Sequence, residues 1–281
     1  METLFRIKTR DLLVAALLSM TACTFVMAIT PTEALAQADN ENAAKKAFDE
    51  AERSFRTKDY IEAIRRYNLL RTRFPYSGWA TLADLRIADA YFEQEKYATA
   101  IEQYRAFTKL HPEHERVTYS NWRVALSFYK QMPEDWFFLP PGYERDLDRA
   151  KDAERELRFY LRRNPNSEYD KDATRKLLET RRRLADHELY VAEFYIKRDN
   201  PRAAALRLTY LLKNYSGLGL DPKALFLLAR AYMEMGDVNK ATTALGDLIE
   251  VHPDSDMAAK ARAYLRRHNL RPPQQQQPEQ P

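Results

Sequence analysis

Apolar residues recur every three or four positions through most of the chain, which is the period of amphipathic α-helices. Short breakers that contain proline, glycine or asparagine separate these stretches. The pattern predicts an all-α protein. Helices are expected over residues 43–56, 59–73, 79–95, 97–110, 117–131, 146–163, 169–197, 201–214, 221–235, 239–252 and 255–269.

The expected helices form pairs that repeat in phase. An alanine stands at the same position near the start of each second helix, with spacings of 37, 53, 51 and 37 residues: Ala63, Ala100, Ala153, Ala204 and Ala241. A proline follows four of these alanines by twelve residues: Pro75, Pro112, Pro165 and Pro253. This pattern resembles the tetratricopeptide repeat, a helix–turn–helix unit of about 34 residues. The sequence therefore predicts a solenoid of about five helical pairs with a C-terminal capping helix, a fold that binds other proteins along a concave surface.

The repeats divide the chain into segments. The proline-rich stretch that starts at Pro133 cannot continue a helix, and it explains the first long spacing. Residues 169–197 contain no breaker and predict one long helix, while the end of the chain is rich in proline and glutamine and is expected to be disordered. The division is 1–36 as export signal, 37–132 as N-terminal repeats after a polar lead-in over 37–42, 133–146 as insertion, 147–269 as C-terminal repeats and cap, and 270–281 as tail.

Composition argues against nucleic-acid binding and catalysis. Charged residues make up 31% of the chain with both signs interspersed, and the net charge is only +4, so no concentrated basic stripe marks a nucleic-acid binder. Glycine-rich phosphate loops, nucleophile elbows and metal-spaced cysteine pairs are absent from the sequence. His111 and His114 flank a proline turn, which does not hold two imidazoles as a helical pair does. We therefore expect neither an enzyme nor a cofactor or metal site.

The N-terminus predicts export from the cytoplasm. A basic region precedes an apolar core that begins at Leu12 and is too short for a convincing membrane span. Two processing sites compete. Cys23, the only cysteine, stands in a context like a bacterial lipobox, which predicts lipidation; Ala36 ends a small-x-small site for cleavage before Gln37. The residues alone leave both open, and neither allows a disulfide.

Aromatic residues are more numerous than packing between helices requires, with 17 Tyr, 13 Phe and 3 Trp. Repeat phase predicts which positions of the early first helices face a groove: Phe48, Phe55, Leu85, Phe92, Tyr119, Trp122 and Tyr129. Lys45, Arg56 and Lys130 lie on or beside the same face. Such a groove suits an extended peptide that bears aromatic side chains and a carboxylate. The alternative is that some of these residues pack against neighbouring helices.

Three segments have a more specific pattern than the repeat itself: YNLLRTRFPYS at residues 67–77, NPNSEY at residues 164–169, and Arg183 and Glu188 followed by VAEFY at 191–195, which contains Glu193. Together they resemble the BamD family, the outer-membrane assembly lipoproteins of Gram-negative bacteria. The first segment resembles the end of that family's first repeat, the second resembles the entry into its long helix, and the third resembles its signature on that helix. The resemblance covers about residues 43–265.

This resemblance implies a periplasmic scaffold of the β-barrel assembly machinery. Its N-terminal repeats would receive unfolded outer-membrane proteins, and its C-terminal half would bind the POTRA repeats of the BamA-like barrel subunit through Arg183, Glu188 and Glu193. The family's lipid anchor favours lipidation of Cys23 and a location on the periplasmic face of the outer membrane, with accessory lipoproteins as further partners. The alternative is a periplasmic repeat adaptor of the Tol–Pal cell-envelope system, which carries an N-terminal coiled coil that no sustained heptad predicts here.

Overall fold

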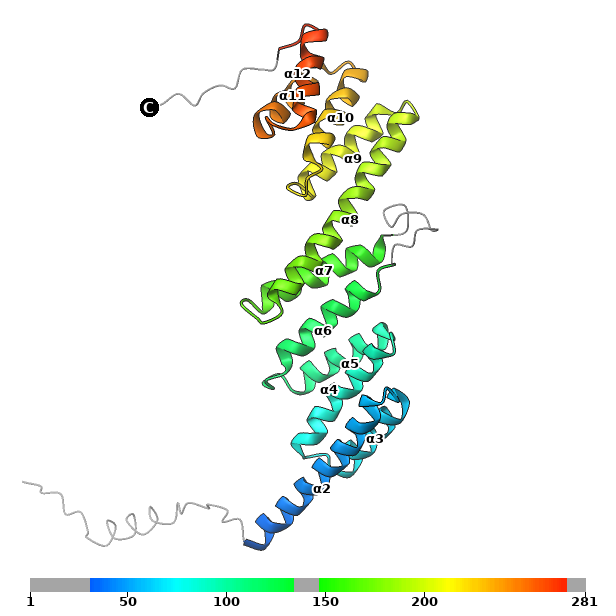
Figure 1. Cartoon of the computed structure of the whole chain (residues 1–281), viewed down its shortest axis with the longest axis vertical. Coiled ribbons are helices and arrows are strands. Elements are labelled where there is room, and N and C mark those ends of the chain that lie inside the picture. Colours follow the sequence, from blue (N-terminus) through cyan, green and yellow to red (C-terminus); the bar gives the residue numbers. More distant parts are fainter. Residues whose placement is uncertain (1–30, 134–146, 272–281) are drawn as a thin grey trace, which may run out of the picture.

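The chain folds into an elongated stack of antiparallel helices (Figure 1). The computed structural model describes residues 31–133 and 147–271, and these contain eleven helices and no strand. The helices are α2 (Pro31–Arg56), α3 (Tyr60–Arg73), α4 (Gly78–Glu93), α5 (Tyr97–Leu110), α6 (Val117–Lys130), α7 (Asp148–Arg163), α8 (Asp170–Lys197), α9 (Pro201–Asn214), α10 (Asp221–Glu234), α11 (Val238–Val251) and α12 (Asp256–Arg267). Each packs mainly against its neighbours along the chain, as in a repeat solenoid.

The helices form five pairs and a cap, which confirms the predicted fold class. The pairs are α2–α3, α4–α5, α6–α7, α8–α9 and α10–α11, and α12 packs against both helices of the last pair. The five phased alanines that open the second helices are fully buried. A methyl side chain at these positions lets adjacent helix backbones approach closely, and this explains why the same small residue recurs.

The turn between the two helices of a pair has a similar form in pairs one, four and five. Asp59, Asn200 and Asp237 cap the second helices of pairs one, four and five, because each side chain accepts a hydrogen bond from the backbone N–H three residues later. Just before these caps, Lys58 has a left-handed φ of 62° and Asp199 one of 53°, whereas Gly236 supplies the same conformation in the last pair at 77°. The connection is thus short and regular even where the residue is not glycine.

The first helix is longer than expected. The predicted lead-in over residues 37–42 is helical, because α2 begins at Pro31 and continues to Arg56. Proline is favoured in the first turn of a helix, where its missing N–H has no partner to lose. Side chains 37–43 are exposed, so this part of α2 extends beyond the packed repeats (Figure 1). Residues 134–146 of the insertion predicted over 133–146, residues 272–281 of the tail predicted over 270–281, and Cys23 lie outside the described residues.

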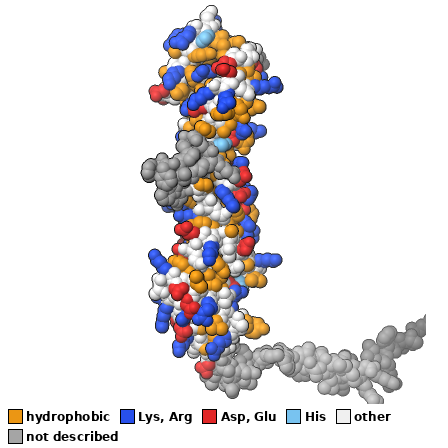
Figure 2. All heavy atoms as spheres, turned by 90° about the vertical axis from the view of Figure 1, so that its right-hand side faces the viewer, with side chains coloured by type: hydrophobic (Ala, Val, Ile, Leu, Met, Phe, Trp, Pro, Cys, Tyr) orange, Lys and Arg blue, Asp and Glu red, His pale blue; other side chains and the backbone are white. Residues whose placement is uncertain are grey.

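The surface carries charges of both signs. On the face shown in Figure 2, basic and acidic side chains alternate along the stack with apolar ones between them. The long helix α8 is confirmed, with 28 residues and a length of about 42 Å. Within the described part of the chain, no helix is long and apolar enough to cross a membrane.

Candidate functional site: a repeated aromatic and cationic ladder

The site consists of similar contacts that repeat along the stack, and each of them is called a step. The first step joins the first two repeats. The guanidinium of Arg86 on α4 lies over the ring of Phe55 on α2, with Cζ 3.9 Å from the ring centroid. The same guanidinium donates two hydrogen bonds to Glu52, at 2.6 and 2.9 Å, in a bidentate pair. The hydroxyl of the buried Tyr67 also donates to Glu52. These contacts fix both the ring and the cation.

The second step repeats this arrangement one pair further along the stack. The guanidinium of Arg123 on α6 lies over Phe92 on α4, with Cζ 3.7 Å from the centroid. Its Nε donates to the hydroxyl of Tyr104 at 2.9 Å, and that hydroxyl donates to Asp89 at 2.6 Å. The hydroxyl of Tyr119 donates to the same Asp89 oxygen at 2.8 Å and so belongs to the same hydrogen-bond network. Asp89 is only 3% exposed, so these hydrogen bonds replace those that its carboxylate would make to water.

The two steps are related by a fixed offset of 37 residues. The equivalent positions are Glu52 and Asp89, Phe55 and Phe92, Tyr67 and Tyr104, and Arg86 and Arg123. A third step has the same geometry with other side chains: Lys176 Nζ on α8 lies 4.4 Å from the ring centroid of Tyr129 on α6. We call these three aromatic–cation pairs the ladder. The ladder consists of Phe55 with Arg86, Phe92 with Arg123, and Tyr129 with Lys176.

Burial and neighbouring charges shift the pKa values of the acidic and tyrosine side chains in and around the ladder. Burial would raise the pKa of Glu52, but hydrogen bonds from Arg86 and Tyr67 outweigh it and hold that pKa below its usual value. Burial and a neighbouring carboxylate raise the pKa of Tyr67, Tyr104 and Tyr119. Burial and the hydrogen bond to Glu179 raise the pKa of Tyr129 to about 12. At neutral pH the tyrosines are therefore uncharged donors and Glu52 is ionised.

The arrangement suits binding. Arg86 is paired with Glu52 and Asp89, and Arg123 with Glu93 and the Asp89 network. The cations thus orient the rings and leave little uncompensated charge, while Phe55 and Phe92 remain half-buried and can present apolar surface.

The histidine turn considered as a metal site has another contact. Nε2 of His111 lies 3.1 Å from Oδ2 of Asp84, and no cluster of potential metal ligands occurs in the described residues.

The predicted groove residues separate into two groups. Phe48, Leu85 and Trp122 are at most 9% exposed and pack in three different core clusters. Trp122, for example, stacks on Tyr169 with ring centroids 5.9 Å apart. These three fill space between helices and do not line an open groove, which corrects the expectation for them.

The other predicted groove residues, Phe55, Phe92, Tyr119 and Tyr129, are half-buried and belong to the ladder or its network. Repeat phase failed to single out Glu52, Arg86, Asp89 and Arg123, although the shared 37-residue offset in the sequence could have identified them.

The residues expected to contact the barrel subunit lie along α8 and contact neighbouring parts of the chain. Arg183 donates to the backbone oxygen of Pro133 at 2.7 Å. Glu188 accepts from Arg207 on α9 at 3.3 Å, and Glu193 pairs with Lys223 on α10 at 2.5 Å. All three are partly exposed. They therefore combine contacts within the chain with surface that a partner could reach.

Comparison with known sequences matches most of the chain to one family. Residues 40–246 match the model of the family described as outer membrane lipoprotein, YfiO. The outer membrane protein assembly factor BamD of Vibrio cholerae is 26% identical over 211 residues, which are 73% of this chain and 86% of that protein. The protein of the same description from Neisseria meningitidis serogroup A is 30% identical over 206 residues, covering 72% of this chain and 76% of its own. Among solved structures, the TPR2AB domain of yeast Sti1 is similar, at 16% identity and a TM-score of 0.41, over 81% of this chain and 86% of that chain.

Proposed function

Because this chain belongs to the outer membrane lipoprotein family that includes the assembly factor BamD, we propose that its ladder receives unfolded outer-membrane proteins. Family membership supplies the broader role, which is assembly of outer-membrane proteins by a scaffold that is not an enzyme. It also decides against the Tol–Pal alternative. The proposal adds a client-binding surface on repeats one to three.

The geometry of the ladder is the observation that supports this proposal. Its rings lie in register on successive first helices, and the guanidinium groups that hold Phe55 and Phe92 already have acidic partners. An extended client can place aromatic side chains against such a series of rings. Since Arg86 and Arg123 are already paired, aromatic contact rather than a free client carboxylate supplies most of the recognition.

The remaining parts of the proposal concern attachment. The C-terminal half binds the POTRA repeats of the barrel subunit around Arg183, Glu188 and Glu193, with accessory lipoproteins as additional partners. Lipidation of Cys23 holds the scaffold on the periplasmic face of the outer membrane. The half-exposed side chains on α8 support the first part, and the sequence context of Cys23 supports the second.

Binding of a defined peptide tests client recognition. The probe is a fluorescent peptide that copies the last strand of an outer-membrane protein and ends in phenylalanine. Phe92→Ala is expected to weaken its binding about thirtyfold, corresponding to about 2 kcal/mol for an aromatic binding hot spot. Tyr76→Ala is the matched control, because Tyr76 is fully exposed in the turn after α3. Unchanged affinity of a folded Phe92→Ala variant would show that the ladder is not the client site.

A further inference from the structure

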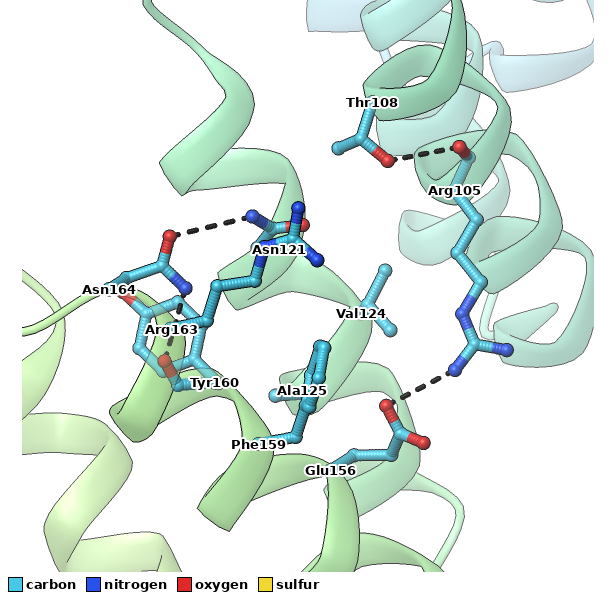
Figure 3. Close-up of a pocket in the computed structure, with 10 residues that line it drawn as sticks. All are labelled: Arg105, Thr108, Asn121, Val124, Ala125, Glu156, Phe159, Tyr160, Arg163 and Asn164. Atoms are coloured by element: carbon cyan, nitrogen blue, oxygen red, sulfur yellow. Dashed lines mark hydrogen bonds and ion pairs between the residues drawn. The ribbon is translucent and has the colours of Figure 1, made fainter. Parts of the chain in front are cut away.

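A second recessed site lies between α5, α6 and α7, on a different face of α6 from the ladder. Val124, Ala125 and Tyr160 form its apolar base, and Phe159 stands at its edge with 47% of its surface exposed (Figure 3). The cleft has a volume of about 280 Å³. Pockets for drug-sized ligands typically enclose roughly 300–1,000 Å³, so this one fits one or two side chains of a larger partner.

The charges around the cleft are unequal. Arg105 and Glu156 face each other across it and pair at 3.1 Å. Arg163 has its guanidinium 5.9 Å from the ring centroid of Phe159, and no carboxylate among the described residues lies within ion-pair distance of it. The side chain of Arg163 reaches across the cleft toward Asn121 (Figure 3). The cleft therefore carries an uncompensated positive charge beside an exposed aromatic ring.

An amide group at the same place is weakly engaged. Among residues 31–133 and 147–271, the Asn121 amide donates one hydrogen bond, a long one of 3.4 Å to Asn164, while Asn164 donates to the backbone oxygen of Tyr160 at 3.1 Å. A side-chain amide has both donors and an acceptor, so the Asn121 group can bind the N–H and C=O of a passing peptide. The cleft thus offers apolar, cationic and backbone-binding groups within one space.

We propose that this cleft binds an extended internal segment of another protein in which an apolar side chain stands next to aspartate or glutamate. The apolar side chain lies between Phe159 and Val124, and the neighbouring carboxylate pairs with Arg163. A guanidinium suits this role because it binds a carboxylate through two parallel hydrogen bonds. The site is separate from the ladder, so it gives the scaffold a second partner whose binding does not require displacement of a client.

Nuclear magnetic resonance of the full chain tests the assignment. The probe is the blocked peptide acetyl-Gly-Ser-Phe-Glu-Ser-Gly-amide, and its control has lysine in place of glutamate. The acidic peptide is expected to shift the side-chain amide signals of Asn121 and Asn164 in a saturable manner, and the lysine peptide is expected to leave them in place. Arg163→Gln should weaken binding of the acidic peptide about tenfold, as expected for loss of a charged hydrogen-bonding partner.

The matched control is Arg162→Gln. Arg162 is the exposed neighbour on α7 and does not line the cleft, so its loss removes the same charge and should leave binding unchanged. Equal binding of the acidic and lysine peptides, or an equal effect of the two arginine variants, would overturn the proposal. Binding of acetyl-phenylalanine with its free carboxylate, but not of the blocked peptide, would also overturn it, since the cleft would then take chain ends.

Discussion

Asp89 is the residue on which the ladder's second step depends most. One carboxylate oxygen accepts from Tyr104 at 2.6 Å and from Tyr119 at 2.8 Å, and the other accepts from Arg86 at 2.9 Å. Replacement by asparagine keeps the shape and removes one acceptor. If the amide oxygen faces Arg86, its NH₂ group meets the tyrosine hydroxyls. In the native chain the Tyr104 hydroxyl accepts from Arg123 and donates its proton to Asp89. In the variant an NH₂ group would stand where the accepting oxygen was, so this proton would have no acceptor there.

The expected cost follows from burial. Removing one partner of a buried ionic network typically costs 3–5 kcal/mol, and the remaining hydrogen bonds of the amide place Asp89→Asn near the lower limit, at about 3 kcal/mol. For a domain of this size, a loss of about 1 kcal/mol lowers the melting temperature by roughly 2–4 °C, so the expected decrease is about 6–12 °C. Because solenoid repeats can open separately, amide exchange should increase most in α4, α5 and α6.

Circular dichroism during heating and hydrogen exchange read by mass spectrometry measure these effects. Asp49→Asn is the control, because it makes the same change in an exposed carboxylate that pairs with Lys45 at 3.0 Å. Exposed pairs of this kind contribute at most about 1 kcal/mol. If Asp89→Asn melts within about 1 °C of the Asp49→Asn variant, far less than the expected decrease, and exchange in α4–α6 is unchanged, the network does not support the ladder as argued.

Three further predictions concern attachment and pH. Arg183→Glu should abolish co-purification of the barrel subunit from detergent-solubilised membranes, whereas Lys171→Glu, the same change at an exposed site of α8, should not; full recovery with Arg183→Glu would rule out this contact. Mass spectrometry of the mature N-terminus should find an acylated Cys23, and a soluble form that begins at Gln37 would refute the anchor. Because burial raises the folded-state pKa of Tyr67, Tyr104 and Tyr119, the folded chain keeps protons that the unfolded chain releases above about pH 10, so the free energy of unfolding should fall as pH rises past that value. Tyr104→Phe should reduce this pH dependence of the urea midpoint and Tyr76→Phe should not; equal dependence in both would contradict the reasoning.

Much of the fold could be predicted from local signals. The 3.6-residue period, the phased alanines and the proline breakers locate the second helices to within a few residues, because each signal acts within a single repeat. The predicted start of the first helix, at residue 43, is wrong because the local signals are missing there. Residues 37–43 are polar and exposed, so no apolar face indicates helix there, and the continuation from Pro31 depends on intrinsic helix preference.

The site was harder to predict because side-chain direction depends on neighbouring repeats. Phe48 and Phe55 are both aromatic residues of one helix, yet Phe48 packs against Tyr67 and Trp79 while Phe55 lies beneath Arg86. The difference comes from which residue of the next helix meets each ring. The sequence does indicate which aromatic residue meets an arginine. An acidic residue, an aromatic residue and an arginine recur together at an offset of 37 residues, and comparing the two repeats reveals them.

The helix α8 connects the two surfaces that the proposed function needs. Near its start, Lys176 lies over Tyr129 and Glu179 accepts from the hydroxyl of that tyrosine at 2.6 Å. Near its other end, Glu193 pairs with Lys223 of the C-terminal repeats. This single helix of 28 residues is about 42 Å long, so its start lies against the third pair of the ladder while its later turns carry Arg183 and Glu188. In the proposed function, a client at Tyr129 and a barrel subunit at Arg183 and Glu188 would therefore bind at different points along one continuous helix.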